Sequence, residues 1–416
     1  MPSAVDGARD EALDGRAAWP ESFDELFAQV AGVFGNAAVR RHGRWCLLGL
    51  LSRQERKNSW RPAEFAGDVP PDGMQRLLNF PPWDEDAARD ALARYVARRM
   101  GDPAAVPAAG ETGFFKKGKM PAGVARMYTG TAGRAENCQA GVFAAYVTPD
   151  GGRALAGREL CLPGAWTGDR ERCQRAGIGN DAEFAAKPEL AWTMIERAAG
   201  AGIPFAWVAG GEVHGGGPEL RKRLEEHGIP YVMAVSCDAM IATAAGSKRA
   251  GELAGLVPRD GRQRLSCAGG SRGPRLYDWA PAATASPQHH LPARRSLQPG
   301  EKGVLELAFF RCWSPRPVTL AELIAVAGAR RGAEDCFAEA KGEAGLDRYQ
   351  VREYRAWHRH AALSMLAHAF LSVTARDSRP RPPAGGDDGE APAKKGDLTP
   401  ADNFSPRPGH TPRQHS

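Results

Sequence analysis

The sequence predicts an α/β fold, in which a mixed β-sheet core follows an N-terminal helical domain and is interrupted by a β-rich insertion. Three observations favour this class. Apolar residues recur at helical spacing in residues 21–103, short β-like runs broken by Gly and Pro begin near residue 106, and strands alternate with helices from about residue 187. A strand meander followed by alternating strands and helices is typical of a mixed sheet in an α/β layer.

The helical domain is expected to begin after a loose leader over residues 1–20. Ser22 is the expected N-cap of the first helix, with Glu25 completing a capping box. Further helices are expected at 36–52 and 84–100. The apolar stripes of the first and third helices are Phe23, Leu26, Phe27, Val30, Leu92, Val96 and Met100.

The core is expected to contain a strand meander and then alternating elements. Helices are predicted at 187–200 and 218–227, with buried strands from Phe205 to Ala209 and from Tyr231 to Val235. The meander before them consists of four short strands: Val106 to Ala109, Arg126 to Thr129, Ala140 to Val147 and Ala154 to Leu162.

The second half of the chain contains the insertion and two long helices. Gly, Pro and Arg dominate the insertion, which has strand-like pieces at 275–279 and 304–310, and the helices are expected at about 319–343 and 350–375. The predicted units are a disordered leader 1–20, the helical domain 21–103, a first core part 104–236, the β-rich insertion 237–317, the C-terminal core helices 318–376 and a disordered tail 377–416.

The composition is that of a globular chain with an excess of loop formers. Of 416 residues, 43% are hydrophobic and 25% are charged, which excludes a wholly disordered, collagen-like or coiled-coil protein. The 49 Gly and 32 Pro indicate long loops or tails, or glycines accumulated at positions that did not require them.

Targeting and cysteine signals are weak. The N-terminal residues lack the apolar stretch of an export signal, and no apolar window reaches the ~20 residues that a membrane helix requires, so a cytoplasmic protein is expected. The eight cysteines form no C-x-x-C pair, which argues against a disulfide framework or a zinc ribbon. We expect them to be reduced, buried small hydrophobes.

The net charge of +6 is concentrated in one segment. Residues 36–61 carry seven basic residues and one acidic residue, so they account for the whole excess. Helix positions 40, 41 and 44 share a face and could match a phosphate backbone, although a solvated helix face is the alternative. The basic residues are Arg40, Arg41, Arg44, Arg53, Arg56, Lys57 and Arg61, and a second basic group in the insertion includes Arg294 and Arg295.

A charged triplet lies in the first of the two late helices. Arg330, Glu334 and Lys341 have the spacing Arg-x3-Glu-x6-Lys. At 100° per residue, Glu334 lies about 40° from Arg330 and Lys341 about 20° from Glu334, so the three project from one side. Such a triplet on its own is usually a salt ladder along a helix.

Several longer motifs give the triplet a context. They are LLSRQERKNSW (50–60), ETGFFKKG (111–118), YTGTAGRAENCQAGVF (128–143), KPELAW (187–192), CFAEAKGEAGLDRYQVR (336–352) and LSMLAHAFL (363–371). With these motifs in this order, the chain resembles bacterial insertion-sequence transposases of the DDE endonuclease superfamily, in the branch with a Tyr-x2-Arg-x3-Glu-x6-Lys signature.

The resemblance implies an RNase H-like core, an N-terminal helical region that binds terminal inverted repeats of double-stranded DNA, and a β-rich insertion before the last catalytic helix. It also implies a homodimer on DNA in the bacterial nucleoid. The implied reaction is DNA strand cleavage and transfer by three carboxylates that hold two Mg²⁺ or Mn²⁺ ions. Glu334, with Arg330 and Lys341, matches the late catalytic helix, and Glu334 is the one metal ligand that the motif supplies.

The chain departs from the pattern at both catalytic Asp positions, which are Gly110 and Gly211. Glu111 and Glu212 are each one residue away, but successive side chains of a strand point to opposite faces, so neither is expected to replace the missing ligand. Asp238 is another carboxylate near a strand end. The chain is therefore expected to be an impaired transposase, with a catalytically dead inverted-repeat binder or a decaying relic as alternatives.

Most other departures from the family pattern are reachable by a single A-to-G or T-to-C base change. Ala327 stands at the signature Tyr, His214 at a Tyr, Arg331 at a position that is often Trp, and Ala108 and Ala109 at Val positions. Such substitutions suggest base-composition drift after selection relaxed, which should also weaken the core.

Two smaller features have open interpretations. Lys116 and Lys117 could contact DNA phosphate or belong to a solvated turn. His358 and His360 are expected to be helix-surface residues and poor joint metal ligands.

Overall fold

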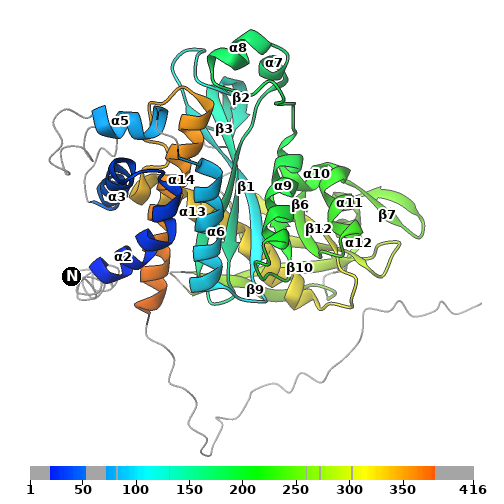
Figure 1. Cartoon of the computed structure of the whole chain (residues 1–416). Helices are drawn as coiled ribbons and strands as arrows, with labels where there is room; N and C mark the ends of the chain where they lie inside the picture. The colour runs from blue at the N-terminus through cyan, green and yellow to red at the C-terminus, as the bar shows by residue number, and fades with distance from the viewer. Residues whose placement is uncertain are drawn as a thin grey trace, which may run out of the picture.

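A mixed β-sheet with helices on both faces forms the centre of the molecule (Figure 1). In this computed structural model, the described residues are 19–52, 72–80, 83–130, 132–258, 260–270, 273–300 and 303–379. Most of the predicted leader and tail lies outside them. None of the helices in the described part of the chain is long and apolar enough to cross a membrane.

The sheet has ten strands in the order β2-β3-β1-β5-β6-β12-β11-β10-β9, with β4 also paired to β3. The pairs β1–β5 and β5–β6 are parallel and the others are antiparallel. The strands are β1 Val106–Phe115, β2 Ala125–Thr129, β3 Arg134–Val147, β4 Arg153–Leu160, β5 Val208–Gly210, β6 Tyr231–Val235, β9 Gln263–Gly270, β10 Gly273–Ala282, β11 His289–Pro299 and β12 Leu305–Trp313. A separate hairpin pairs β7 Met240–Thr243 with β8 Gly246–Arg249.

The order β4-β3-β1-β5-β6, with an antiparallel meander leading into parallel strands, is consistent with the predicted RNase H-like core. The strands predicted within the insertion do not form a separate sheet. Strand β12 pairs with β6 along residues 309–313, so β9 to β12 extend the central sheet on its far side.

Helices pack on both faces of the sheet. They are α2 Trp19–Val30, α3 Ala37–Leu51, α5 Asp72–Asn79, α6 Glu85–Met100, α7 Gly164–Thr167, α8 Arg170–Arg175, α9 Lys187–Gly200, α10 Glu212–Gly216, α11 Pro218–Glu226, α12 Ala250–Leu256, α13 Leu320–Ala344 and α14 Tyr354–Asp377, with a 3-10 turn η2 Ala31–Val33. Alternation along β1 divides the core: Ala108 packs in the cluster that contains α13 and α14, and Ala109 packs with α9 and α11.

Helix α14 lies between the N-terminal helices and the sheet (Figure 1). Its side chains are buried around almost its whole circumference, from Ala356 to Phe370. The prediction that His358 and His360 lie on a helix surface is therefore wrong, because tertiary packing covers every face of this helix. Burial lowers the pKa of His360 to about 4, so its ring is neutral near pH 7.

Most predicted elements occur, but several boundaries differ; strand β3, for example, begins at Arg134 and not at Ala140. Helix α2 begins at Trp19, so Ser22 is inside the helix and does not cap it; Trp19 packs edge-on against Phe370, 5.6 Å between ring centroids, which extends the helix. Strand β1 continues to Phe115 because β3 pairs with it over ten residues. The predicted strand at 205–209 is reduced to Val208–Gly210.

Candidate functional site

The two glycines at the expected Asp positions lie side by side where the parallel pairing of β1 with β5 ends. Ala109 of β1 pairs with Gly210 of β5, which places Gly110 next to Gly211. Gly211 is the N-cap of the short helix α10. In open α/β sheets, the carboxyl edge of adjacent parallel strands is where ligands bind.

Helix α13 places Glu334 over this edge. Thr319 and Glu322 cap its start reciprocally. Glu334, Arg330, Gly110 and Gly211 together line a hollow of about 290 Å³. The structure thus brings together the three positions at which the resemblance expects metal ligands, and one of the three carries a carboxylate.

The Glu334 carboxylate already has a partner. Arg330 Nη2 donates to Glu334 Oε1 at 2.7 Å, one helical turn away. The side chain of Glu334 is 51% exposed, so solvent screens this pair and it contributes little to stability. Glu334 is therefore both part of an i,i+4 ion pair along the helix and a lining residue of the hollow.

Phe337 also lines the hollow, although the motif that contains it indicated no role for its side chain. A Cβ atom added at Gly110 would lie 3.1 Å from Phe337 Cε2 and 3.5 Å from Ala333 Cβ. At Gly211 the nearest atom would be Arg330 Nε at 3.5 Å, an ordinary contact. The spacing of Phe337 from Arg330 and Glu334 along α13 would have placed it on this face of the helix.

Glu111 lines the same hollow, but its carboxylate is directed toward α9 and α10 and not toward Glu334. Its Oε1 lies 3.4 Å from Lys187 Nζ and its Oε2 lies 3.7 Å from His214 Nδ1, on the side of the sheet covered by α9 and α10. His214 is fully buried, and burial lowers its pKa to about 4. The alternation argument for Glu111 therefore matches the geometry.

The other two neighbouring carboxylates differ in position. Glu212 is exposed at the start of α10 and lines the hollow. Asp238 lies 3.7 Å from Arg249 in the segment around the β7–β8 hairpin and does not line the hollow.

Lys341 contacts β1 rather than the hollow. Its Nζ donates to Thr112 Oγ1 at 2.7 Å and to the Gly113 carbonyl at 3.4 Å, so it ties α13 to the strand that carries Gly110. Burial lowers the pKa of its ammonium group.

The basic segment is described in part. Arg40 and Arg41 are exposed on α3, whereas Arg44 is paired with Asp24 at 2.6 Å. The Arg40 Nε atom also donates to the Ala31 carbonyl at 3.1 Å. Arg53, Arg56, Lys57 and Arg61 lie outside the described residues.

The two lysines after β1 are not equivalent. Lys117 is exposed. Lys116 Nζ lies 3.3 Å from the centroid of the Tyr349 ring, and burial lowers its pKa to about 8. Its ammonium group faces the protein, so Lys117 is the better placed to meet a phosphate.

Arg294 and Arg295 are adjacent on β11 and therefore face opposite sides of the sheet. Arg294 lies 4.4 Å from the centroid of the Tyr277 ring. Arg294 pairs in register with Trp279, and paired residues lie on the same face of a sheet. Because Trp279 packs in the cluster that contains α13, Arg294 lies on the α13 face. Arg295 is paired with Asp278 at 3.2 Å.

A family comparison agrees with this arrangement. The sequence model of the DDE superfamily endonuclease family matches residues 29–266, more than half of the chain. The chain belongs to the DDE superfamily of endonucleases. A search of curated proteins found no match. Endonucleases of this superfamily act on DNA and generally use divalent metal ions.

The residues at the hollow do not fit a pair of divalent ions in this DDE superfamily member. Such a site needs several carboxylate oxygens around both ions. Of the three carboxylates that line the hollow, Glu334 is bound by Arg330, Glu111 contacts Lys187, and Glu212 is exposed at the start of α10. Two of the three expected ligand positions are glycines.

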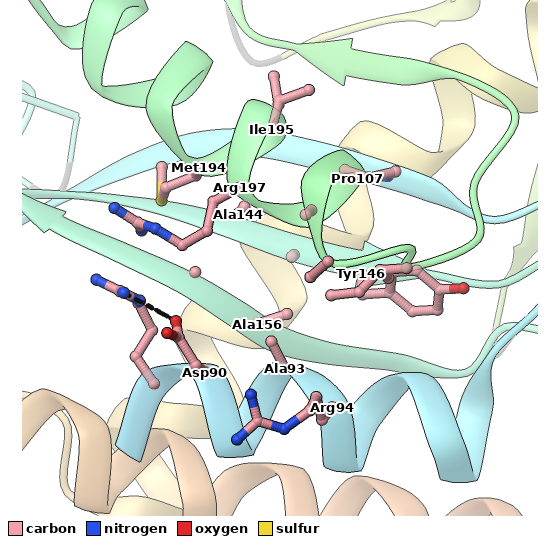
Figure 2. A pocket seen from close by; sticks show the side chains of 16 residues that line it. Asp90, Ala93, Arg94, Pro107, Ala144, Tyr146, Ala156, Met194, Ile195 and Arg197 are labelled. Carbon is pink, nitrogen blue, oxygen red and sulfur yellow. Dashed lines mark hydrogen bonds and ion pairs between the residues drawn. The ribbon is translucent and has the colours of Figure 1, made fainter. Parts of the chain in front are cut away.

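Two other places have the shape or the chemistry of a site. An apolar pocket of about 130 Å³ lies between α6, β3, β4 and α9, lined by Ala144, Ala156 and Met194 among others (Figure 2). Its carboxylate, Asp90, is paired with Arg89 at 2.8 Å. The pocket therefore offers no free carboxylate to a metal ion.

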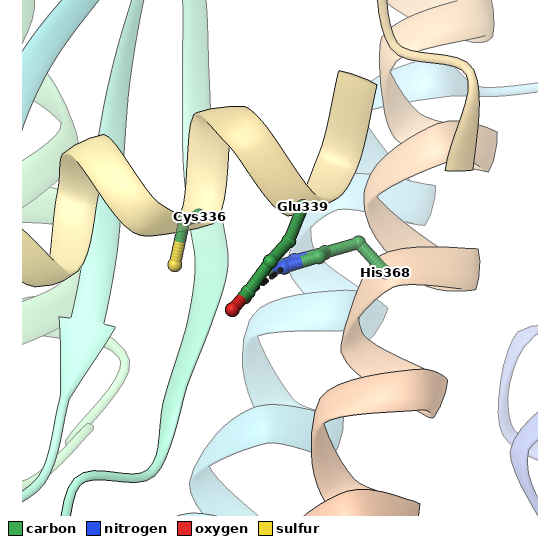
Figure 3. A group of neighbouring side chains, drawn as sticks. All are labelled: Cys336, Glu339 and His368. Carbon is green, nitrogen blue, oxygen red and sulfur yellow. Dashed lines mark hydrogen bonds and ion pairs between the residues drawn. The ribbon is translucent and has the colours of Figure 1, made fainter. Parts of the chain in front are cut away.

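The second place is a cluster of Cys336 and Glu339 on α13 and His368 on α14 (Figure 3). Their ligand atoms lie within 4.8 Å of one another, which is metal-ligand spacing. However, Arg153 of β4 donates to Glu339 and lies 3.8 Å from Asp335. The guanidinium supplies the positive charge that a metal ion would bring, so we interpret the cluster as an ion-pair network between elements.

Proposed function

We propose that this DDE superfamily member descends from an insertion-sequence transposase, that it binds the terminal inverted repeats of its element, and that its DNA cleavage is impaired. One observation carries the proposal: Gly110, Gly211 and Glu334 line one hollow beside the end of the parallel pairing of β1 with β5. Of the three positions at which the family pattern expects a carboxylate, only Glu334 carries one.

The loss concerns charge rather than shape. Two missing aspartates remove two negative charges and up to four ligand oxygens from the hollow. Arg330 compensates the Glu334 carboxylate that is left. Glu111 and Glu212 also line the hollow, but Glu111 contacts Lys187 and neither stands at an expected ligand position, which supports impaired chemistry.

DNA binding is supported by cations that still face solvent. Arg40 and Arg41 are exposed on α3, in the most basic part of the sequence. Arg294 lies on the α13 face of the sheet, the same face as the hollow. Contacts of this type position a protein on the phosphate backbone and make its affinity depend on salt.

The cleavage test uses DNA with the element's own ends and Mn²⁺. We expect the wild-type chain and Glu334→Gln to nick at the same background rate, and the double variant Gly110→Asp with Gly211→Asp to nick faster. Adding Glu334→Gln to the double variant should abolish the gain. Metal-dependent nicking by the wild type that Glu334→Gln removes would show that the site is not impaired.

The binding test uses gel shifts at several salt concentrations. Arg40→Ala with Arg41→Ala should weaken binding and reduce the salt slope by about one per contacting arginine. Arg175→Ala is the matched control, because this arginine is exposed on α8 and pairs with Glu171 at 3.8 Å. Equal affinity for end DNA and unrelated DNA would exclude the inverted-repeat part of the proposal.

A further inference from the structure

A second hollow, of about 490 Å³, lies between α11, β6, β12 and the β7–β8 hairpin. Figure 1 shows α11 and β7 next to each other at this end of the sheet. Phe310 and Cys312 of β12 pack in the cluster that contains α13, whereas Arg311 between them lines the hollow. The hollow therefore lies on the face of the sheet opposite Glu334.

Two arginines from different elements line this hollow. Arg221 of α11 is 9% exposed and donates to the Gly215 carbonyl, and Arg311 donates to the Met240 carbonyl. Within the described residues, no carboxylate forms an ion pair with either guanidinium. Arg221 is buried and Arg311 is half-buried. Two charges of the same sign without an ion-pair partner are costly there, since each has lost hydration that a neutral carbonyl does not fully replace.

One acid lines the same hollow: Glu225 attracts both guanidinium groups, although within the described residues it forms an ion pair with neither. The Glu225 carboxylate accepts a 2.7 Å hydrogen bond from Tyr231 Oη and lies 3.4 Å from His289 Nε2. Lys222, with a 69% exposed side chain, lies at the mouth and pairs with Glu226 at 3.9 Å. The two guanidinium groups outnumber the one carboxylate that lines the hollow, so its interior is cationic.

We propose that this hollow binds a phosphate group. Guanidinium groups with free N–H donors recognise phosphate oxygens by paired, charge-assisted hydrogen bonds. The volume is in the range of small-molecule sites, larger than one phosphate needs. The phosphate can belong to a small phosphorylated compound or to a DNA backbone that passes over this face.

The test measures binding of pyrophosphate and of an unrelated 20-base-pair duplex to the full chain by calorimetry. Arg311→Met keeps the apolar stem and removes the guanidinium, and we expect at least one probe to bind about tenfold more weakly. Arg249→Met is the control, since this arginine lies near the hairpin, outside the lining, and is 60% exposed. Lys222→Glu is the second variant, because a surface substitution at the mouth should weaken binding without disturbing the core.

The outcomes separate the two sources. Duplex binding that depends on Arg311 and is competed by pyrophosphate identifies a backbone phosphate. Pyrophosphate binding that depends on Arg311, with unchanged duplex binding, identifies a small phosphorylated ligand. If neither probe binds in a way that Arg311→Met or Lys222→Glu weakens, the proposal is wrong.

Discussion

At the residue scale, the candidate site is determined by which side chains are missing and which atoms occupy the space. Gly211 faces open space toward Arg330, but Gly110 lies under Phe337. The two glycines are therefore not equivalent as positions for a restored carboxylate. This difference gives a stability prediction that is independent of activity.

Gly211→Asp should leave the free energy of unfolding nearly unchanged, because its Cβ would make one ordinary contact and its carboxylate would lie near Arg330. Gly110→Asp should destabilise by about 1–3 kcal/mol, because Phe337 must shift. Urea unfolding of the two single variants measures this order. A Phe337→Leu background should reduce the cost of Gly110→Asp; the same cost in both backgrounds would contradict the packing argument.

A second residue-scale prediction concerns acid stability. Burial alone would raise the pKa of Glu339, but hydrogen bonds from His368 and Arg153 outweigh it and lower the pKa from its usual 4.5 to about 2. Because the folded-state pKa is depressed, the ionised carboxylate stabilises the fold above pH 4.5, and this contribution is lost as the pH falls toward 2. The 39% exposure of the side chain moderates the size of the effect.

Chemical unfolding between pH 5 and 2 measures this contribution. The wild type should lose stability over this range faster than Glu339→Gln, which has no charge to titrate. Glu183→Gln, a change at an exposed position, is the control and should follow the wild type. Parallel curves for wild type and Glu339→Gln would show that the network is not linked to protonation.

At the element scale, α13 carries Glu334 to the hollow and packs closely on strands of the sheet. Its small residues allow a close approach to two strands: a Cβ at Gly328 would lie 1.9 Å from the Cys267 carbonyl of β9, and one at Gly332 would lie 2.7 Å from Val147 Cγ2 of β3. Gly342, near the end of the helix, faces nothing within 4 Å. Glycine thus has a packing role at some positions of this helix and none at another.

The paired substitutions Gly328→Ala and Gly342→Ala test this distinction. Gly342→Ala should stabilise by about 0.5–1 kcal/mol, because alanine has the higher helix propensity and loses less backbone entropy. Gly328→Ala should destabilise, since its methyl group cannot fit against the β9 backbone. Thermal unfolding of both variants provides the measurement, and a gain in stability from both would mean that α13 does not approach β9 this closely.

At the scale of the whole molecule, the N-terminal helices and the sheet share one core. Phe370 of α14 contacts both Trp19 and Phe23 of α2, with centroids 5.6 and 5.9 Å apart. Arg359 of the same helix donates to the Leu78 and Trp83 carbonyls. The helical part of the chain is therefore packed on α14, which in turn packs on the sheet.

This shared core predicts a single cooperative unfolding transition. Phe370→Ala should lower stability by about 3–5 kcal/mol and move the whole transition, because it opens a cavity at the junction. Scanning calorimetry is the measurement, and a broad transition already in the wild type would favour a decaying relic over a maintained DNA-binding protein. Phe80→Ala is the control, since this aromatic side chain is 78% exposed.

The sequence by itself determined the family, most helices and strands, and the three positions of the candidate site. These are local properties: helical and strand periodicity and motif spacing depend on neighbours along the chain. Strand alternation was also enough to predict that Glu111 faces away from Glu334.

Only the tertiary structure decided which surfaces are covered. It placed His358 and His360 in the core, turned Lys116 toward Tyr349, joined β9 to β12 to the central sheet, and set Phe337 over Gly110. Each of these depends on segments far apart in the sequence, because burial and pairing are set by contacts between elements. The cationic hollow at Arg221 and Arg311 likewise exists only because α11 and β12 are brought together by the fold.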